Sequence, residues 1–271
     1  MTAALPAERA LRAVLSSYGP LAIAVSGGID SLLLGTLAHR WLAETPVICH
    51  AVSPAVPAAA TQRVRAMAAS EGWALEVLSA GEFDDARYRA NPYDRCYYCK
   101  SRLYAALRTL TGRTVASGTN RDDLGDYRPG LIAAREQGVA HPFVEAGIDK
   151  QTIRALARAA GLGELAELPA QPCLSSRVET GIAIEAADLA FVDALEERLR
   201  RRFGAELTLR VRIRAAGVVV EVPPAMGAAT RRAVAAHAGE VCLAEGRVPA
   251  GVETYRMGSA FVAGRRSCPA R

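Results

Sequence analysis

Long apolar runs are absent from this sequence of 271 residues. No stretch approaches the roughly 18–20 uncharged residues that a membrane span needs. The N-terminus carries Glu8 and Arg9 where a signal peptide would have its apolar core. We therefore expect a soluble, cytoplasmic protein with no membrane partner.

Lysine and aromatic side chains are scarce as well. Lysine occurs only at positions 100 and 150, and aromatic residues make up 6% of the chain. Few rings are thus available to stack on unpaired bases, and no RNA-binding module is recognisable, so we do not expect a nucleic-acid partner.

Positive charge gathers in the C-terminal third. Residues 198–271 hold 14 Arg against 5 Glu, whereas the rest of the chain is net acidic. The surplus reflects either a general replacement of Lys by Arg or a surface for an anionic partner, such as a nucleotide, a phosphorylated metabolite or RNA.

Short apolar runs alternate with helix-patterned segments in the first part of the chain. This β-α-β-α alternation predicts an α/β fold with a doubly wound parallel sheet, which binds ligands at the carboxyl ends of its strands. The expected strands are 21–25, 46–52, 73–79 and 114–117, and the expected helices between them are 30–42, 58–71 and 97–110.

A second, smaller α+β domain is expected after residue 183. Its predicted elements are a long helix at 184–203, strands at 207–214 and 217–222, and a helix near 225–238. We therefore divide the chain into domains 1–183 and 184–271, and expect the Arg-rich second domain to contact substrate or another subunit.

The segment AVSGGIDS follows the first predicted strand and opens a helix, which is the setting of a phosphate-binding loop. Gly27 and Gly28 allow the backbone to approach an anion, and the helix N-terminus adds N–H donors. Ser26 and Ser31 offer hydroxyl groups. The alternative is an ordinary strand-to-helix turn in which Asp30 or Ser31 caps the helix.

This loop lacks the Gly-Lys-Ser/Thr ending of a Walker loop, and no G-x-G-x-x-G is present. A lysine-free loop that contains Asp30 suggests a pyrophosphate cradle to which Mg²⁺ and arginines from elsewhere supply positive charge. SGGIDS resembles the PP-loop of the ATP pyrophosphatases, HUP-like enzymes that split ATP into AMP and pyrophosphate while they adenylate a carboxylate or carbonyl oxygen.

Six cysteines are present, and three of them are candidates for a metal or redox site. Cys49 and Cys242 lie in apolar runs and are expected to be buried small hydrophobic residues. Cys96 and Cys99 form a C-x-x-C pair, and Cys173 lies in PAQPCLSSR. These three suit part of a zinc site, a redox dithiol, or a [4Fe–4S] cluster with one iron left without a protein ligand.

Longer motifs help to choose between these three roles of the cysteines. Together with SGGIDS, the segments NPYDRCYYCK (91–100), GTNRDDLGDYRPG (118–130), HPFVEAGIDKQTIRALAR (141–158) and QPCLSSR (171–177) resemble the LarE family. This family comprises the PP-loop sulfur transferases that help to make the nickel-pincer nucleotide cofactor of lactate racemase. The resemblance covers residues 20–183 and weakens thereafter.

The resemblance implies a two-stage reaction. ATP adenylates a carboxylate of pyridinium-3,5-biscarboxylic acid mononucleotide, and a sulfur nucleophile then displaces AMP to give a thiocarboxylate. One branch of the family sacrifices the sulfur of a single cysteine, and another binds a [4Fe–4S] cluster that delivers external sulfide. Because it has Cys96, Cys99 and Cys173, this chain resembles the cluster branch. The resemblance also implies a symmetric homo-oligomer.

The same resemblance gives roles to further residues. Cys173, Asp30 and Arg177 are the expected catalytic residues, and Cys96, Cys99 and Cys173 the expected cluster ligands. ATP, Mg²⁺ and substrate are expected to contact the loop together with Ser53, Gly118, Asn120, Asp122, Arg128, Arg210 and Arg212. Asp122, Asp123 and Asp126 equally suit Asx-type turns, and Arg128 and Arg177 equally suit exposed ion pairs. Arg210, Arg212 and Arg214 share one strand face, which also suits solvent or a subunit contact.

Two other functions fit these residues. One is a PP-loop tRNA thiolase, for which steeply salt-dependent tRNA binding would be diagnostic. The other is a non-catalytic nucleotide-binding protein with a structural metal, which would bind ATP without releasing pyrophosphate.

Overall fold

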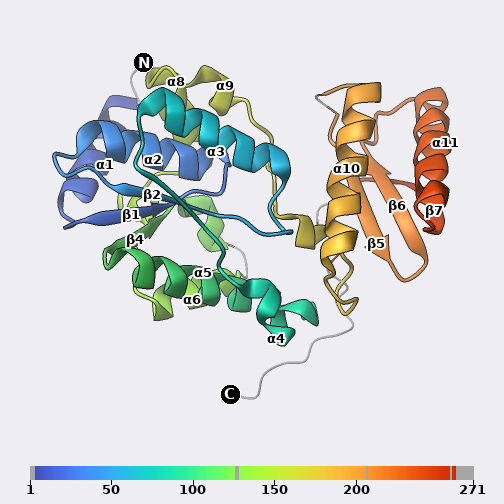
Figure 1. The fold of residues 1–271 in the computed structure, drawn as a ribbon. Helices are drawn as coiled ribbons and strands as arrows, with labels where there is room; N and C mark the ends of the chain where they lie inside the picture. Colours follow the sequence, from blue (N-terminus) through green and yellow to red (C-terminus); the bar gives the residue numbers. More distant parts are fainter. Residues whose placement is uncertain (1–3, 126–127, 206, 257, 261–271) are drawn as a thin grey trace. The chain divides into compact units, whose positions relative to one another are not determined.

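The computed structural model describes residues 4–125, 128–205, 207–256 and 258–260 (Figure 1). The chain forms two compact units. Unit one comprises Met1–Asp85 and Cys96–Gln171, and unit two comprises Ala86–Arg95 and Pro172–Arg271. The compact units therefore part after Gln171, twelve residues before the predicted domain boundary at 183, and a short segment from the first half of the chain belongs to unit two.

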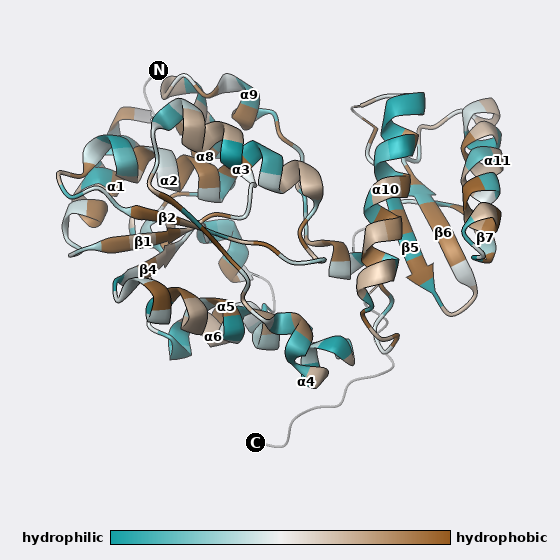
Figure 2. Ribbon diagram, in the orientation of Figure 1, coloured by the Kyte–Doolittle hydropathy of each residue, from teal (hydrophilic) through white to brown (hydrophobic). Residues whose placement is uncertain are grey.

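Unit one is built on a four-stranded sheet, and this confirms the predicted α/β fold with a parallel sheet. The strand order is β3-β2-β1-β4, and every neighbouring pair is parallel. The strands are β1 (Leu21–Ala24), β2 (Val47–Ala51), β3 (Leu75–Leu78) and β4 (Thr114–Ser117). Figure 2 shows β1, β2 and β4 as largely hydrophobic, as expected of strands covered on both faces.

Helices cover both faces of this sheet. On one face Leu21, Ile23 and Ile48 join a core with helices that include α2, in which every residue from Ile29 to Ala38 except Asp30 is buried. On the other face Ala22 and Cys49 pack with residues of α5 and α6. The helices of unit one are α1 (Ala4–Ser16), α2 (Ile29–Trp41), α3 (Ala58–Glu71), α5 (Arg95–Thr111, whose first residue belongs to unit two), α6 (Pro129–Glu136), α7 (Pro142–Glu145), α8 (Lys150–Ala159) and α9 (Gly163–Ala166), with 3₁₀ turns η1 (Glu82–Asp84) and η2 (Arg121–Gly125).

The strand order creates a switch point beside β1. The chain proceeds from β1 to β2 and β3 on one side and then returns to place β4 on the other. In open α/β sheets ligands bind outside the carboxyl ends of the strands at such a point. The loop 25–28 after β1 and the segment 118–125 after β4 both start at this edge.

Unit two contains a mixed three-stranded sheet with the order β5-β6-β7. β5 and β6 are antiparallel, whereas β6 and β7 are parallel. Its elements are α4 (Ala86–Arg89), η3 (Leu174–Arg177), α10 (Ala186–Phe203), β5 (Arg210–Arg214), β6 (Gly217–Val222), α11 (Ala228–Ala244) and β7 (Pro249–Thr254). α11 is longer than the sequence suggested, because Val241 and Cys242 continue the helix up to Ala244. None of the described helices is long and apolar enough to cross a membrane.

Candidate functional site

The segment 26–31 links β1 to α2 in a close turn. Gly27 has a φ of +84°, a conformation that glycine adopts without steric cost. The hydroxyl of Ser31 accepts a hydrogen bond from the Ser26 amide at 3.0 Å and donates to the Gly28 carbonyl at 3.1 Å. The helix N-cap is Gly28, which makes no side-chain capping bond. The first N–H groups of α2 have no partner within the helix and suit an anion.

Two glycines let neighbouring backbone approach this loop. A Cβ on Gly27 would lie 2.7 Å from the Ala60 carbonyl oxygen of α3, and a Cβ on Gly118 would lie 2.7 Å from the Ser31 amide nitrogen. Real Cβ atoms do not tolerate such distances. The 26–31 loop is thus packed between α3 and the segment after β4, and Gly118 lies next to Ser31. Its predicted contact with the nucleotide stays a prediction.

Lys150 supplies a positive charge that the loop itself lacks. Its ammonium nitrogen lies 2.6 Å from each carboxylate oxygen of Asp30, and its backbone amide donates to Asp122 at 3.0 Å. Burial raises the pKa of Asp30, and the ion pair with Lys150 partly offsets that rise. Lys150 was not among the predicted site residues. Its rarity was the available signal, because this chain has only two lysines.

The segment after β4 is folded by its own side chains. The side-chain oxygen of Asn120 accepts from the Asp122 amide at 3.0 Å, and Asp123 accepts from the Asn120 amide at 3.1 Å. Arg128 forms an ion pair with Asp123 at 2.7 Å. These are the Asx-type turns and the ion pair that the sequence offered as alternatives to ligand binding. Asp126 lies outside the described residues.

Ser53 follows β2 at the same edge of the sheet. Its hydroxyl accepts a hydrogen bond from the Ala55 amide at 3.2 Å and so shapes the turn after the strand. Within β2, the imidazole of His50 is buried and contacts the Val25 carbonyl and the Thr61 hydroxyl, and burial lowers its pKa. Ser53 therefore lies where adenosine was expected, and its binding role stays a prediction.

In unit two a buried ion pair stabilises the turn that carries Cys173. Cys173 is the N-cap of η3 and is exposed. The guanidinium of Arg177 donates to Glu196 of α10 at 2.9 and 3.1 Å, and to the Pro172 carbonyl at 2.9 Å. Both side chains of this pair are almost wholly buried. Arg177 is thus bonded to protein groups that fix this turn, and its ion pair is buried rather than exposed as the sequence suggested. Its contact with phosphate or carboxylate stays a prediction.

The alternating arginines of β5 also pair with a buried carboxylate. Arg212 lies 2.7 Å and Arg214 2.8 Å from Glu221 on β6, and Arg212 further donates to the Ser176 carbonyl at 2.8 Å. Arg210 is 7% exposed and Arg212 is 5% exposed, so a solvated face is wrong for these two residues. The basic surplus of the C-terminal third is thus partly buried within unit two.

Cys96 and Cys99 lie in the first turns of α5, and both are half-buried thiols. Arg95, which precedes Cys96, ends the first segment of unit two. That segment is bonded to the region just after Cys173. Tyr88 and Ser175 share a hydrogen bond of 2.6 Å, and the Asn91 amide donates to the Glu179 carbonyl at 2.9 Å. Cys49 and Cys242 are buried, as predicted, and burial raises the pKa of Cys49 to about 11.

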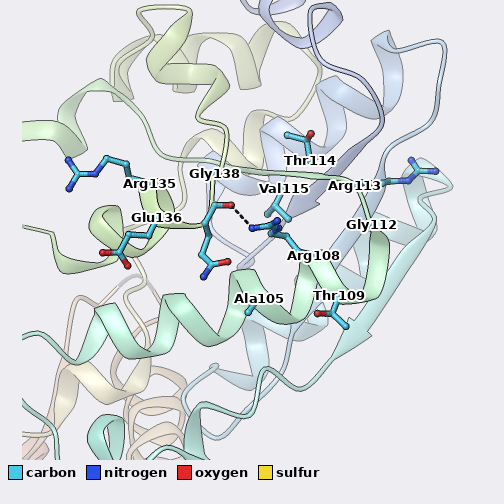
Figure 3. A pocket seen from close by; sticks show the side chains of 11 residues that line it. Ala105, Arg108, Thr109, Gly112, Arg113, Thr114, Val115, Arg135, Glu136 and Gly138 are labelled. Atoms are coloured by element: carbon cyan, nitrogen blue, oxygen red, sulfur yellow. Dashed lines mark hydrogen bonds between the residues drawn. The ribbon is translucent and has the colours of Figure 1, made fainter.

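A separate hollow of about 860 Å³ lies in unit one (Figure 3). It is lined by the end of α5, by Thr114 at the start of β4 and by residues 135–138, and Arg108 donates there to the Gln137 carbonyl at 3.4 Å. Because Thr114 begins its strand, this hollow lies at the amino edge of the sheet. The predicted nucleotide site is at the opposite, carboxyl edge.

Comparison with known proteins adds independent information. No family model matches the chain. An uncharacterised protein of Synechocystis is 40% identical over 183 residues, which are 66% of this chain and 68% of that protein. An uncharacterised protein of Methanocaldococcus jannaschii is 32% identical over 184 residues, with the same coverage of 66% and 68%.

A third relative has a name that describes its reaction. The pyridinium-3,5-bisthiocarboxylic acid mononucleotide synthase of Lactiplantibacillus plantarum is 30% identical over 197 residues, which are 70% of each chain. The chain belongs to this LarE family. The resemblance seen in the motifs is thereby confirmed at the level of the family, while the cysteine branch is not decided by it.

The candidate site residues of this LarE family member are divided between the two units. Unit one brings together the 26–31 loop, Gly118, Asp122 and Lys150. Unit two holds Cys173, Arg177 and the β5 arginines, and Cys96 and Cys99 belong to unit one. Among the residues that the structure describes, no three or more His, Cys, Asp or Glu side chains gather around a possible metal position. The cluster therefore stays a prediction.

Proposed function

We propose that this LarE family member is an ATP-dependent sulfur transferase. Its substrate would be pyridinium-3,5-biscarboxylic acid mononucleotide, whose carboxylates it converts to thiocarboxylates with release of AMP and pyrophosphate. The product would serve the nickel-pincer cofactor of lactate racemase-type enzymes. The name of the Lactiplantibacillus plantarum relative supports the substrate class.

One observation carries the proposal. A glycine loop without lysine lies at the switch point of the parallel sheet, and a lysine from another element, Lys150, neutralises the aspartate within it. A Walker-type loop places its lysine on the phosphates that it holds through transfer. A loop that offers backbone N–H groups, hydroxyls and an external lysine instead suits a pyrophosphate that leaves.

In the first stage a substrate carboxylate oxygen attacks the α-phosphorus of ATP, and the bond to the β-phosphate oxygen breaks. The leaving pyrophosphate would be bound by the N–H groups at the start of α2 and by the hydroxyls of Ser26 and Ser31. Asp30 would hold the Mg²⁺ that accompanies ATP, and Lys150 would then turn from Asp30 to the phosphates. Preorganised donors of this kind stabilise charge that develops during transfer.

In the second stage sulfide attacks the carbonyl carbon of the acyl adenylate, and AMP leaves with the electron pair of the broken C–O bond. Cys96, Cys99 and Cys173 would hold a [4Fe–4S] cluster, which supplies an open iron to carry external sulfide. Their donor set fits, because all three are thiols and Cys96 and Cys99 are one helical turn apart. The segments before Cys96 and after Cys173 are bonded to each other within unit two.

The reaction is tested by pyrophosphate release from ATP with the full chain. We expect release that depends on the pyridinium mononucleotide and on sulfide, together with a thiocarboxylate product detected by mass spectrometry. Release driven by unmodified tRNA instead would favour a tRNA thiolase. ATP binding without any release would leave a non-catalytic nucleotide-binding protein.

The sulfur source is tested by iron and acid-labile sulfide content after anaerobic purification. About four of each per chain, lost in Cys96→Ala, Cys99→Ala and Cys173→Ala but kept in Cys49→Ala, is the expected result. Cys49 is a suitable control because it is buried in the core of unit one. Zinc alone, or loss of mass from Cys173 after one turnover, would contradict the cluster.

A further inference from the structure

Arg63, on α3, is bonded directly to the phosphate loop. Its Nη1 donates to the carbonyl oxygen of Gly27 at 2.6 Å, and the same nitrogen donates to the side-chain oxygen of Gln171 at 3.3 Å. Gly27 is the residue with positive φ, and α3 packs against it through the Ala60 carbonyl. In a trans peptide the C=O and N–H groups point in opposite directions. By binding the Gly27 carbonyl, Arg63 therefore also fixes the direction of the Gly28 N–H.

The charge of Arg63 is not balanced by a carboxylate. Its side chain is half-buried, and burial lowers its pKa. In the described part of the chain no carboxylate forms an ion pair with it, whereas the exposed Arg40 is bound by both oxygens of Glu71. A partly buried cation costs free energy unless an anion compensates it. Its position at the loop therefore points to an anion from outside the protein.

Arg63 also retains donors for such an anion. Its Nε and Nη2 make no hydrogen bond to any described residue, which leaves three N–H groups of the planar guanidinium. A guanidinium edge matches two oxygens of a phosphate and binds them in a bidentate manner. Lys150, by contrast, is held by Asp30.

We propose that Arg63 is a ligand of the phosphate chain that the 26–31 loop binds, and that its bond to the Gly27 carbonyl holds the loop in its anion-binding shape. The ligand class is a pyrophosphate group, either free or as part of ATP. This inference rests on the proposed function in so far as the loop binds ATP. It assigns a binding role to a helix outside the loop motif.

The test is isothermal titration of the full chain with inorganic pyrophosphate and with ATP, each in the presence of Mg²⁺. Loss of a charge-assisted hydrogen-bond pair is expected to weaken pyrophosphate binding about 10- to 100-fold in Arg63→Ala. Arg63→Lys keeps a positive charge but lacks the two parallel donors of a guanidinium edge, so its affinity for pyrophosphate should lie between those of the unchanged chain and Arg63→Ala. Arg65→Ala is the matched control, since Arg65 is an exposed arginine on the same helix. The dissociation constant of Arg65→Ala for pyrophosphate should stay within about twofold of that of the unchanged chain.

A second variant separates charge from anchoring. Arg63→Gln keeps an amide donor for the Gly27 carbonyl but carries no charge, so a tenfold loss there assigns the effect to the charge. It also serves if Arg63→Ala fails to fold, as judged by circular dichroism. Gln171→Ala should bind pyrophosphate with a dissociation constant within about threefold of that of the unchanged chain, because Gln171 contacts only Nη1 and its loss leaves the Nε and Nη2 donors unchanged.

Binding of pyrophosphate by Arg63→Ala and Arg63→Gln as tight as that by Arg65→Ala would overturn the inference, even if the chain makes thiocarboxylate. A chain that binds pyrophosphate through Arg63 but makes no thiocarboxylate would refute the proposed reaction and keep the inference. If the unchanged chain binds neither pyrophosphate nor ATP, both are wrong.

Discussion

The ammonium group of Lys150 lies 2.6 Å from both carboxylate oxygens of Asp30, although 120 residues separate them in the chain. α8 begins at Lys150, and Asp149 caps this helix by accepting a hydrogen bond from the Thr152 amide at 2.8 Å. The cap fixes the start of α8 and thereby the position from which Lys150 reaches the loop. The positive charge beside the 26–31 loop thus comes from the N-terminus of a helix that is distant in the sequence.

Replacing Lys150 should shift the pH dependence of nucleotide use. Burial raises the pKa of Asp30 and Lys150 counteracts that rise, so Lys150→Gln should raise this pKa further. Asp30 would then become protonated at a higher pH, and a protonated Asp30 would not hold the Mg²⁺ that we propose it binds. We expect the acidic limb of Mg²⁺-dependent pyrophosphate release, measured from pH 5 to 8, to move to higher pH in this variant, with a raised KM for ATP.

Two further measurements accompany this prediction. Arg158→Gln changes an exposed cation on the same helix and should leave the profile unchanged. The free energy of unfolding should change by less than about 1 kcal/mol in Lys150→Gln, since a partly exposed ion pair contributes little stability. An unshifted acidic limb would show that Lys150 does not control the ionisation of Asp30.

Gly118→Ala should weaken nucleotide binding, because the new Cβ would lie 2.7 Å from the Ser31 nitrogen and 2.8 Å from the Asp30 carbonyl carbon. These are backbone atoms at the start of α2, so the loop must shift to make room. Gly125→Ala is the matched control, since a Cβ there meets nothing within 4 Å. Titration with ATP should show at least a tenfold difference between the two variants. Equal affinities would mean that the contact of Gly118 with α2 does not shape the site.

The sequence predicted unit one better than the site within it. Apolar runs such as that of β1, with helix-patterned segments between them, were enough to predict a parallel sheet and the loop at its edge. The ion-pair partners of charged residues lie on elements that are distant in the sequence, so the sequence did not predict them. Arg177 and Arg212 carried no sign that Glu196 and Glu221 would bind them in the interior. Arg63 lies in ordinary helical sequence, and Lys150 was marked only by the rarity of lysine and by its place in the 141–158 motif. Only the fold brings the two residues to the loop.

Glu196→Gln should destabilise unit two more than any neighbouring change. Glu196 accepts hydrogen bonds from Arg177, Arg200 and the Val211 amide. Removing its charge leaves the buried guanidinium of Arg177 without a carboxylate, which costs about 3–5 kcal/mol in comparable buried pairs. Glu197→Gln, an exposed neighbour, should cost no more than about 0.5 kcal/mol. Urea unfolding at pH 7 measures both, and equal midpoints would contradict a structural role for the pair.

The same carboxylate should make stability depend on pH. Burial alone would raise the pKa of Glu196, but the charges of Arg177 and Arg200 outweigh it, and the pKa lies below the ordinary value of 4.5. A lowered folded-state pKa contributes stability above the unfolded value and loses it as the pH falls through the folded value. Urea midpoints should therefore fall more steeply below about pH 4.5 in the unchanged chain than in Glu196→Gln.

Asn91 should be the residue on which the attachment of the 86–95 segment depends most. It is fully buried, has a φ of 53°, and its amide nitrogen donates to the carbonyls of Glu179 and Ile182 at 2.9 Å. Asn91→Gly keeps the left-handed backbone at no steric cost but leaves these carbonyls without their donor, so a loss of about 2 kcal/mol in the free energy of unfolding is expected.

Asn91→Ala adds the steric cost of a left-handed alanine and should be about 1 kcal/mol less stable than Asn91→Gly. The comparison separates backbone strain from lost hydrogen bonds, because both variants lack the amide. If Asn91 acts only on stability, the iron content of folded Asn91→Gly should match that of the unchanged chain. If the 86–95 segment positions Cys96 for metal binding, iron should fall in the folded variant while pyrophosphate binding by the 26–31 loop persists.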